Sequence, residues 1–145
     1  MMQRNPDLLT IELSDAGGLL VLDAAGCWQR RTETSSLTWN GRERQALHFL
    51  PLLELEPIAF RESVESVGYP ESLVLAVLRT AIQSGSSRWT LRGLYWAEVE
   101  CPTELKKDIL WASNNAPTQA QRHRAKRLLG AIEESLRSLR GTPNV

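Results

Sequence analysis

Residues 118–140 read TQAQRHRAKRLLGAIEESLRSLR. Apolar side chains recur in this stretch every three or four residues, the spacing that places them on one side of an α-helix. Thr118 followed by Gln121 matches a capping box, in which two side chains satisfy backbone amides at the start of a helix. The stretch therefore predicts a long amphipathic helix whose apolar ridge lies in the core. We assign to the ridge Ala125, Leu128, Leu129, Ile132, Leu136 and Leu139.

The same helix gathers positive charge on the side opposite to the ridge. The helical period places these basic residues in water. Glu133 and Glu134 continue this face, within reach of Arg137 for ion pairing. The acidic residues between Glu54 and Glu71 are a candidate partner for the basic residues within the chain. The basic residues are Arg122, His123, Arg124, Lys126 and Arg127.

Bulk composition predicts an ordinary soluble protein. The chain has 145 residues, of which 42% are hydrophobic and 23% charged, and its net charge is zero. This length suits a single domain over residues 1–145, and the composition argues against disorder. The longest apolar run, residues 73–78, is too short to span a bilayer, and no secretory leader opens the chain. We therefore expect a cytoplasmic protein of bacterial type.

Residues 7–50 are predicted to be rich in β-structure. Asn40-Gly41 tolerates the positive φ angles of a type I′ turn, so residues 37–39 and 42–49 are predicted to pair as a hairpin. A turn-rich stretch lies at residues 14–18. Other strand-like runs are residues 8–13, 19–22 and 27–32.

Residues 57–140 are predicted to be mainly helical. Residues 71–84 have almost no polar face, which is typical of a central helix. Residues 87–100 fit either a strand or a helix with Gly93 in its middle, and the short connections on both sides favour a helix. The fold class is therefore α+β: a small N-terminal antiparallel β-hairpin layer followed by a compact bundle of α-helices. Further helices are expected from Pro57 towards Val67 and over residues 103–113.

No pattern of reactive side chains stands out. His48 and His123 are the two histidines, and neither has a second metal ligand at a suitable spacing. Cys27 and Cys101 are interpreted as buried reduced thiols, with a disulfide between them left open. His48 is interpreted as a core or edge-strand residue. Glycine motifs for phosphate and paired carboxylates for acid–base chemistry are missing. We therefore expect no metal, no cofactor and no catalytic activity.

Five tryptophans are a second unusual feature of the composition. Tryptophan and arginine are the side chains most enriched at the centres of protein interfaces. Trp39 stands beside the predicted turn, and Trp111 lies off the line of Leu105 and Ile109. We expect these two indoles to be the most exposed and to take part in binding.

These observations favour a small protein-interaction module without catalytic activity, such as an adaptor or an immunity-like inhibitor. The candidate binding residues are the basic residues of the last helix, Trp39 and Trp111, and the partner is a protein of unknown identity. The alternative is a nucleic-acid-associated regulator that binds phosphates through the basic helix. A cryptic enzyme is a third hypothesis, and it requires His48 or His123 to meet a cysteine or carboxylate in space.

Overall fold

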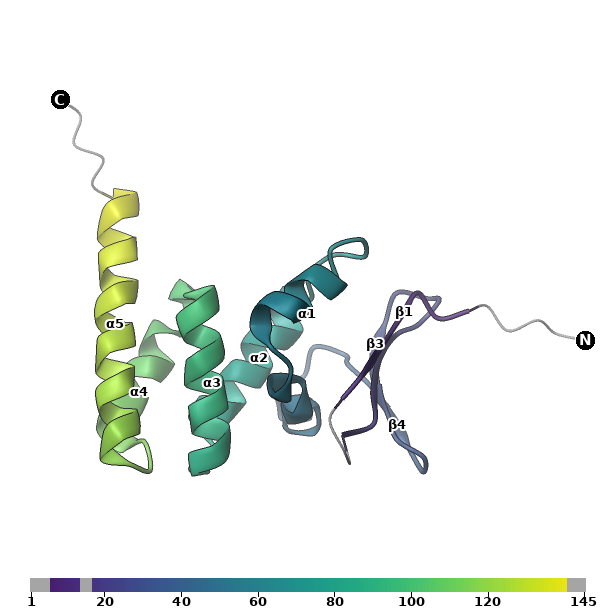
Figure 1. Ribbon diagram of the computed structural model, residues 1–145, viewed down its shortest axis with the longest axis horizontal. Coiled ribbons are helices and arrows are strands. Elements are labelled where there is room, and N and C mark those ends of the chain that lie inside the picture. Colours follow the sequence, from purple (N-terminus) through teal and green to yellow (C-terminus); the bar gives the residue numbers. More distant parts are fainter. Residues whose placement is uncertain (1–5, 14–16, 141–145) are drawn as a thin grey trace, which may run out of the picture. The chain divides into compact units, whose positions relative to one another are not determined.

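A computed structural model describes residues 6–13 and 17–140 of the chain. It has the predicted α+β arrangement, with an antiparallel sheet followed by helices (Figure 1). The chain divides into two compact units, Met1–Val77 and Leu78–Val145. Each unit is considered by itself below, and the expectation of a single domain stays a prediction. Part of the turn predicted at residues 14–18 lies outside the described residues.

Each strand of the first unit pairs antiparallel with the next strand in the chain, so the sheet is a meander. This arrangement confirms the three strand-like runs before residue 33. The strands are β1 (Leu9–Glu12), β2 (Leu19–Leu22), β3 (Trp28–Arg31) and β4 (Ser36–Thr38).

The sheet holds apolar side chains on both sides of its second strand. Leu20 and Val21 point to opposite faces, because successive side chains alternate along a strand, and both are fully buried. Arg30 pairs with Leu20 in the register. Its guanidinium donates to the backbone oxygens of Gly17, at 2.9 Å, and His48, at 3.0 Å. Arg30 therefore connects the sheet to the segment that follows it.

The predicted hairpin between residues 37–39 and 42–49 is wrong. Residues 43–54 form η2 (Glu43–Glu54), a run of 3₁₀ helix, in place of a strand. Gly41 does adopt a positive φ of 87°, but Asn40 does not, so the chain bends here without the predicted type I′ turn and continues into a helix. His48 lies on η2 with its side chain exposed, which corrects its interpretation as a core or edge-strand residue.

The Gln45 side chain explains why a helix, and not a strand, follows the bend at Gly41. The Gln45 amide nitrogen donates to the Thr38 carbonyl at 3.0 Å, and its oxygen accepts from the Asn40 amide at 2.9 Å. Gln45 thus satisfies backbone groups that a partner strand would otherwise have paired. The buried side chains of η2 complete the core of this unit: Ala46, Phe49, Leu50, Leu52 and Leu53.

Two helices follow η2, both at the predicted places. α1 (Pro57–Ser63) begins at a proline, whose missing N–H costs nothing at a helix start. α2 (Glu71–Ile82) is the predicted central helix, and the boundary between the two units falls within it. Its buried side chains are Leu73, Val74, Ala76, Val77, Leu78, Ala81 and Ile82.

The second unit consists of helices. Residues 87–100 are helical, as the short connections indicated, and the Ser86 side chain caps this helix by accepting from the Trp89 amide at 3.3 Å. The last helix, α5 (Gln119–Arg140), begins and runs as predicted. It lies side by side with the helix of residues 87–100, α3 (Figure 1). The residues expected to end α5, Gly141 and Pro143, lie outside the described residues. The elements are α3 (Ser87–Glu100), η3 (Thr103–Leu105), α4 (Lys106–Asn115) and α5 (Gln119–Arg140). None of the described helices combines the length and apolar character that a membrane span requires.

Gly93, in the middle of α3, is explained by its close approach to α2. A Cβ at this position would lie 3.1 Å from the Ala81 Cβ and from the Ile82 Cγ1. A glycine within a helix costs about 1 kcal/mol relative to alanine. The chain accepts this cost because the two helices touch here.

We expect Gly93→Ala to lower the free energy of unfolding by about 1 kcal/mol, because overpacking outweighs the gain in helix propensity. The matched control is Gly130→Ala in α5, where an added Cβ meets nothing within 4 Å. We expect that variant to be more stable by about 0.5–1 kcal/mol. Urea unfolding followed by tryptophan fluorescence measures both. Equal stabilisation by the two substitutions would contradict the close approach at Gly93.

Candidate functional site

The rotation of α5 about its own axis is the starting point for any site on the second unit. Ala125, Leu128 and Ile132 are buried, which confirms most of the predicted ridge. Leu136 is half-buried, and Leu139 is 76% exposed, so the ridge prediction is wrong for its last residue. The buried ridge turns the opposite side of α5 towards water.

The start of α5 is held to α3. The Thr118 hydroxyl accepts from the Gln121 amide at 3.1 Å, which is the first half of the predicted capping box. The second half is wrong, because the Gln121 side chain does not return to the backbone of Thr118. Its amide nitrogen donates to the backbone oxygen of Ser87 at 2.8 Å and to the Ser87 hydroxyl at 3.0 Å. A tertiary contact has replaced the local one.

The basic residues of α5 divide into two groups. Arg124 forms a two-pronged ion pair with Glu98 of α3, with its Nε at 2.8 Å from the carboxylate. The hydrogen bond that Arg124 donates to Glu98 raises the pKa of Arg124 above its ordinary value. Arg122 donates to the carbonyl of Ala116, the residue that follows α4, at 2.8 Å. These two arginines therefore have structural roles.

His123, Lys126 and Arg127 form the second group. Their side chains are exposed, as predicted, and none has an ion pair within the described part of the chain. Farther along α5, Arg137 pairs with Glu134 at 2.8 Å, as the spacing predicted. Uncompensated positive charge is therefore concentrated in the first half of the helix.

A buried carboxylate sets the orientation of α4. Asp108, whose side chain is 10% exposed, accepts from Arg79 at 3.2 Å and from the Gln83 amide. Ile109 and Ala112 are buried together with Asp108, so the side of α4 opposite to these three residues faces water. Leu110 is 48% exposed and Trp111 is 39% exposed. The exposure predicted for Trp111 is confirmed, and Leu110 is an additional apolar residue.

The exposed sides of α4 and α5 meet along the seam between the two helices. Lys106 of α4 lines a small hollow with Glu133 and Arg137 of α5, so the flank of α4 that carries Lys106 faces α5. Leu110, one turn later, lies on the same flank. Arg122 reaches α4, and Lys126, one turn later, lies on that side of α5. Leu110 and Lys126 therefore border the seam, whereas Trp111 and Arg127 lie farther out on their helices. We call the exposed residues of these two helices the α4–α5 surface: Lys107, Leu110, Trp111, His123, Lys126 and Arg127.

The other tryptophans contribute to folding contacts or lie partly covered. Trp39 is half-buried, which corrects the expectation that it is among the most exposed. Its ring packs edge-on against Phe49, with the ring centres 6.0 Å apart, and its Nε1 donates to the Ser72 hydroxyl at 3.4 Å. Trp96 is fully buried. Trp111 is therefore the better candidate for an interface residue.

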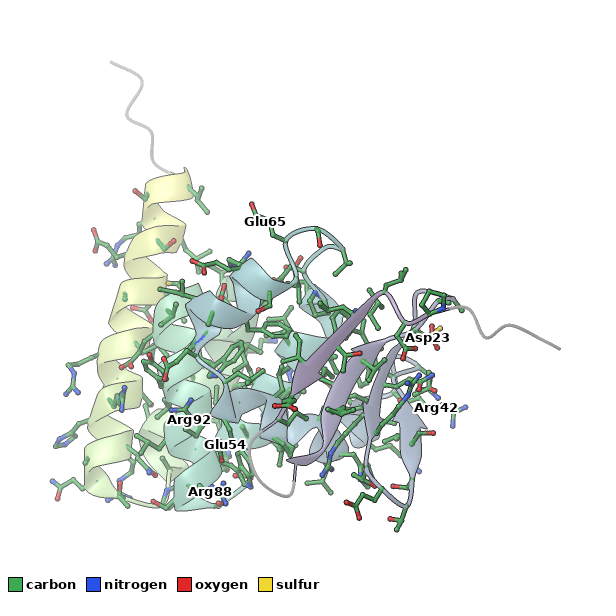
Figure 2. The ribbon with its side chains drawn as sticks, turned by 45° about the vertical axis from the view of Figure 1, so that its right-hand side comes forward. Asp23, Arg42, Glu54, Glu65, Arg88 and Arg92 are labelled. Atoms are coloured by element: carbon green, nitrogen blue, oxygen red, sulfur yellow. The ribbon has the colours of Figure 1, made fainter. Side chains whose placement is uncertain are left out.

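A hollow of the first unit lies on the sheet and has a volume of about 1120 Å³. Asp23, labelled in Figure 2 at the turn after β2, accepts from the Gln29 amide at 2.7 Å. Gln29 accepts in turn from Arg31, whose guanidinium also binds both oxygens of Asp7 at 2.8 and 3.1 Å. The hydrogen bond to Asp7 raises the pKa of Arg31. These polar groups form hydrogen bonds with one another, so their role in the hollow is to hold the local structure together.

The residues considered for catalysis are dispersed. Neither His48 nor His123 hydrogen-bonds a cysteine or a carboxylate in the described ranges. Those ranges contain no group of three His, Cys, Asp or Glu residues that could hold a metal ion. Both thiols are free, with Cys27 exposed and Cys101 partly covered, which corrects the interpretation of both as buried.

Comparison of the chain with protein-family models, with curated proteins and with solved structures found no match. The α4–α5 surface must therefore be interpreted from its own geometry. Lys107 and Leu110 were not singled out from the sequence. Their signal was present, because residues 107, 110, 111 and 114 recur at helical spacing opposite to Ile109 and Ala112.

We expect Asp108→Ala to lower the free energy of unfolding by about 2 kcal/mol, because it removes a buried acceptor of two hydrogen bonds. The matched control is Glu134→Ala, which breaks an ion pair between two side chains that are more than half exposed. That control should change stability by less than about 0.5 kcal/mol. Urea unfolding measures the difference. Similar losses in both variants would show that Asp108 does not anchor α4.

Proposed function

We propose that this protein is a non-catalytic interaction module, and that its helical unit binds an acidic protein partner through the α4–α5 surface. The observation that carries the proposal is the combination of two exposed apolar side chains, Leu110 and Trp111, with three cations, Lys107, Lys126 and Arg127, that have no ion pair in the described residues. Burial of a tryptophan supplies much of the energy of many protein interfaces. The neighbouring cations select a partner of opposite charge.

The charge balance of the unit supports an acidic partner. Residues 78–145 contain eleven Lys and Arg against six Asp and Glu, a balance of +5. The positive charge also lies near the start of α5, and the first turn of that helix has no acidic residue. The backbone dipole makes a helix start favourable for negative charge. A carboxylate-rich partner would be attracted both by the positive charge of this unit and by the backbone dipole at the start of α5.

Exposed apolar residues favour a protein over a nucleic acid as the partner. Contacts with phosphates need several cations and no apolar anchor. On α5, two of the basic residues counted from the sequence, Arg122 and Arg124, are engaged by Ala116 and Glu98. The cations that remain are few, whereas Leu110 and Trp111 have no use in phosphate binding.

The apolar anchor is tested by affinity capture from nuclease-treated lysate of the source cell. We expect the double variant Leu110→Ser/Trp111→Ser to lose a protein that the wild type retains. The matched control is Leu91→Ser, because Leu91 is a similarly exposed leucine on α3. That control should keep the captured protein. Loss of the same protein with Leu91→Ser, or its retention by the double variant, would refute the proposed surface.

The role of charge is tested by two single substitutions in one helix. We expect Arg127→Ala to weaken binding of the captured protein about tenfold. Arg124→Ala removes an arginine that Glu98 already neutralises, so binding should stay within about twofold. Titration with the purified partner measures both. If a DNA duplex of ~20 base pairs instead binds with a steep salt dependence, and Leu110→Ser leaves that binding intact, the nucleic-acid alternative replaces the proposal.

A further inference from the structure

The first unit presents a surface of opposite character on α1. Ile58 is 62% exposed, and Glu62, one turn later, lies on the same side of the helix. Glu65 follows in the next turn, and Figure 2 shows its side chain pointing away from the chain. Neither carboxylate has an ion pair within the described ranges. We call Ile58, Glu62 and Glu65 the α1 face.

A neighbouring arginine does not neutralise this face. The Arg61 guanidinium stacks over the ring of Tyr69, 4.0 Å from its centre. Tyr69 in turn packs edge-on against the buried Phe60. The Arg61 guanidinium is thus placed over the Tyr69 ring, and neither Glu62 nor Glu65 forms an ion pair within the described ranges. The α1 face therefore combines one apolar anchor with negative charge.

The α1 face and the α4–α5 surface carry opposite charge, and each includes an exposed apolar side chain. The α1 face has an exposed isoleucine beside two carboxylates, and the α4–α5 surface has an exposed leucine and tryptophan beside cations. The units as wholes are also complementary. Residues 1–77 contain six Lys and Arg against eleven Asp and Glu, a balance of −5, and residues 78–145 have a balance of +5. Because the net charge is zero, overall repulsion does not oppose the approach of two copies.

We propose that the acidic partner of the α4–α5 surface is the α1 face of a second copy of this chain. The inference rests on the proposed function and names its partner. The contact joins different surfaces on the two copies, so each bound copy still offers one surface of each kind. Such heterologous contacts build rings or open chains of copies. The protein would thus assemble with itself, and dilution or salt would reverse the assembly.

The experiment separates the two surfaces and then recombines them. Glu62→Lys/Glu65→Lys reverses the α1 face, and Lys126→Glu/Arg127→Glu reverses the α4–α5 surface. We expect the wild type to form oligomers in sedimentation velocity runs at about 0.05 M salt and to dissociate at about 0.5 M. Each double variant alone should be monomeric, because like charges facing each other weaken the contact about a hundredfold. An equal mixture should oligomerise again, since each variant retains one intact surface and the two reversed surfaces carry opposite charges.

The matched control is Glu12→Lys/Glu33→Lys, which makes the same charge change at two exposed positions elsewhere in the first unit. That variant should oligomerise like the wild type. Circular dichroism verifies that every variant is folded. A monomeric wild type at low salt, a mixture that stays monomeric, or association unaffected by both surface variants would overturn the proposal.

Failure of this inference and failure of the proposed function give different results. If the wild type is monomeric but Leu110→Ser/Trp111→Ser still loses a captured protein, the α4–α5 surface binds another acidic protein, and the idea of a second copy is wrong. If no variant changes either oligomerisation or capture, both proposals fall.

Discussion

Burial of Ala125, Leu128 and Ile132 sets the rotation of α5, and the character of the second unit depends on it. A helix has one rotation at which its apolar ridge leaves water, and about 25 cal/mol for each Å² of buried apolar surface favours that rotation. Every other side chain of α5 then has its direction fixed. His123, Lys126 and Arg127 point into solvent as a consequence. The positive surface of this unit is thus a result of core packing.

Buried polar contacts add orientation to this packing. Gln121 holds the start of α5 to Ser87, and Asp108 holds α4 to the end of α2. Apolar contacts tolerate small rotations, whereas a buried hydrogen bond is lost when its partners move apart. Together these contacts determine which side of α4 is left uncovered. That side carries Leu110 and Trp111, two residues that the core does not need.

The number of basic residues along a helix does not by itself show how strongly that helix attracts a negatively charged partner. Residues 122–127 look uniform in the sequence, yet Arg122 caps α4 and Arg124 pairs with Glu98. A paired arginine has little attraction left for a partner, because its charge is already compensated at short range. On the α1 face the opposite holds, since Glu62 and Glu65 remain without ion pairs among the described residues. Complementarity between two such surfaces depends on these uncompensated groups.

Local patterns by themselves determined the strands before residue 33, the central helix, and the course and start of α5. These features follow from apolar periodicity and from capping within a few residues. The pattern failed at residues 42–49, where the buried positions Ala46, Phe49 and Leu50 already had helical spacing, and the Gln45 side chain took the hydrogen bonds of the predicted partner strand. Only the tertiary structure decided which of the arginines at residues 122–127 is neutralised and why Gly93 is a glycine. The physical reason is that each of these depends on atoms brought close by folding from distant parts of the chain, and a local sequence pattern contains no information about such neighbours.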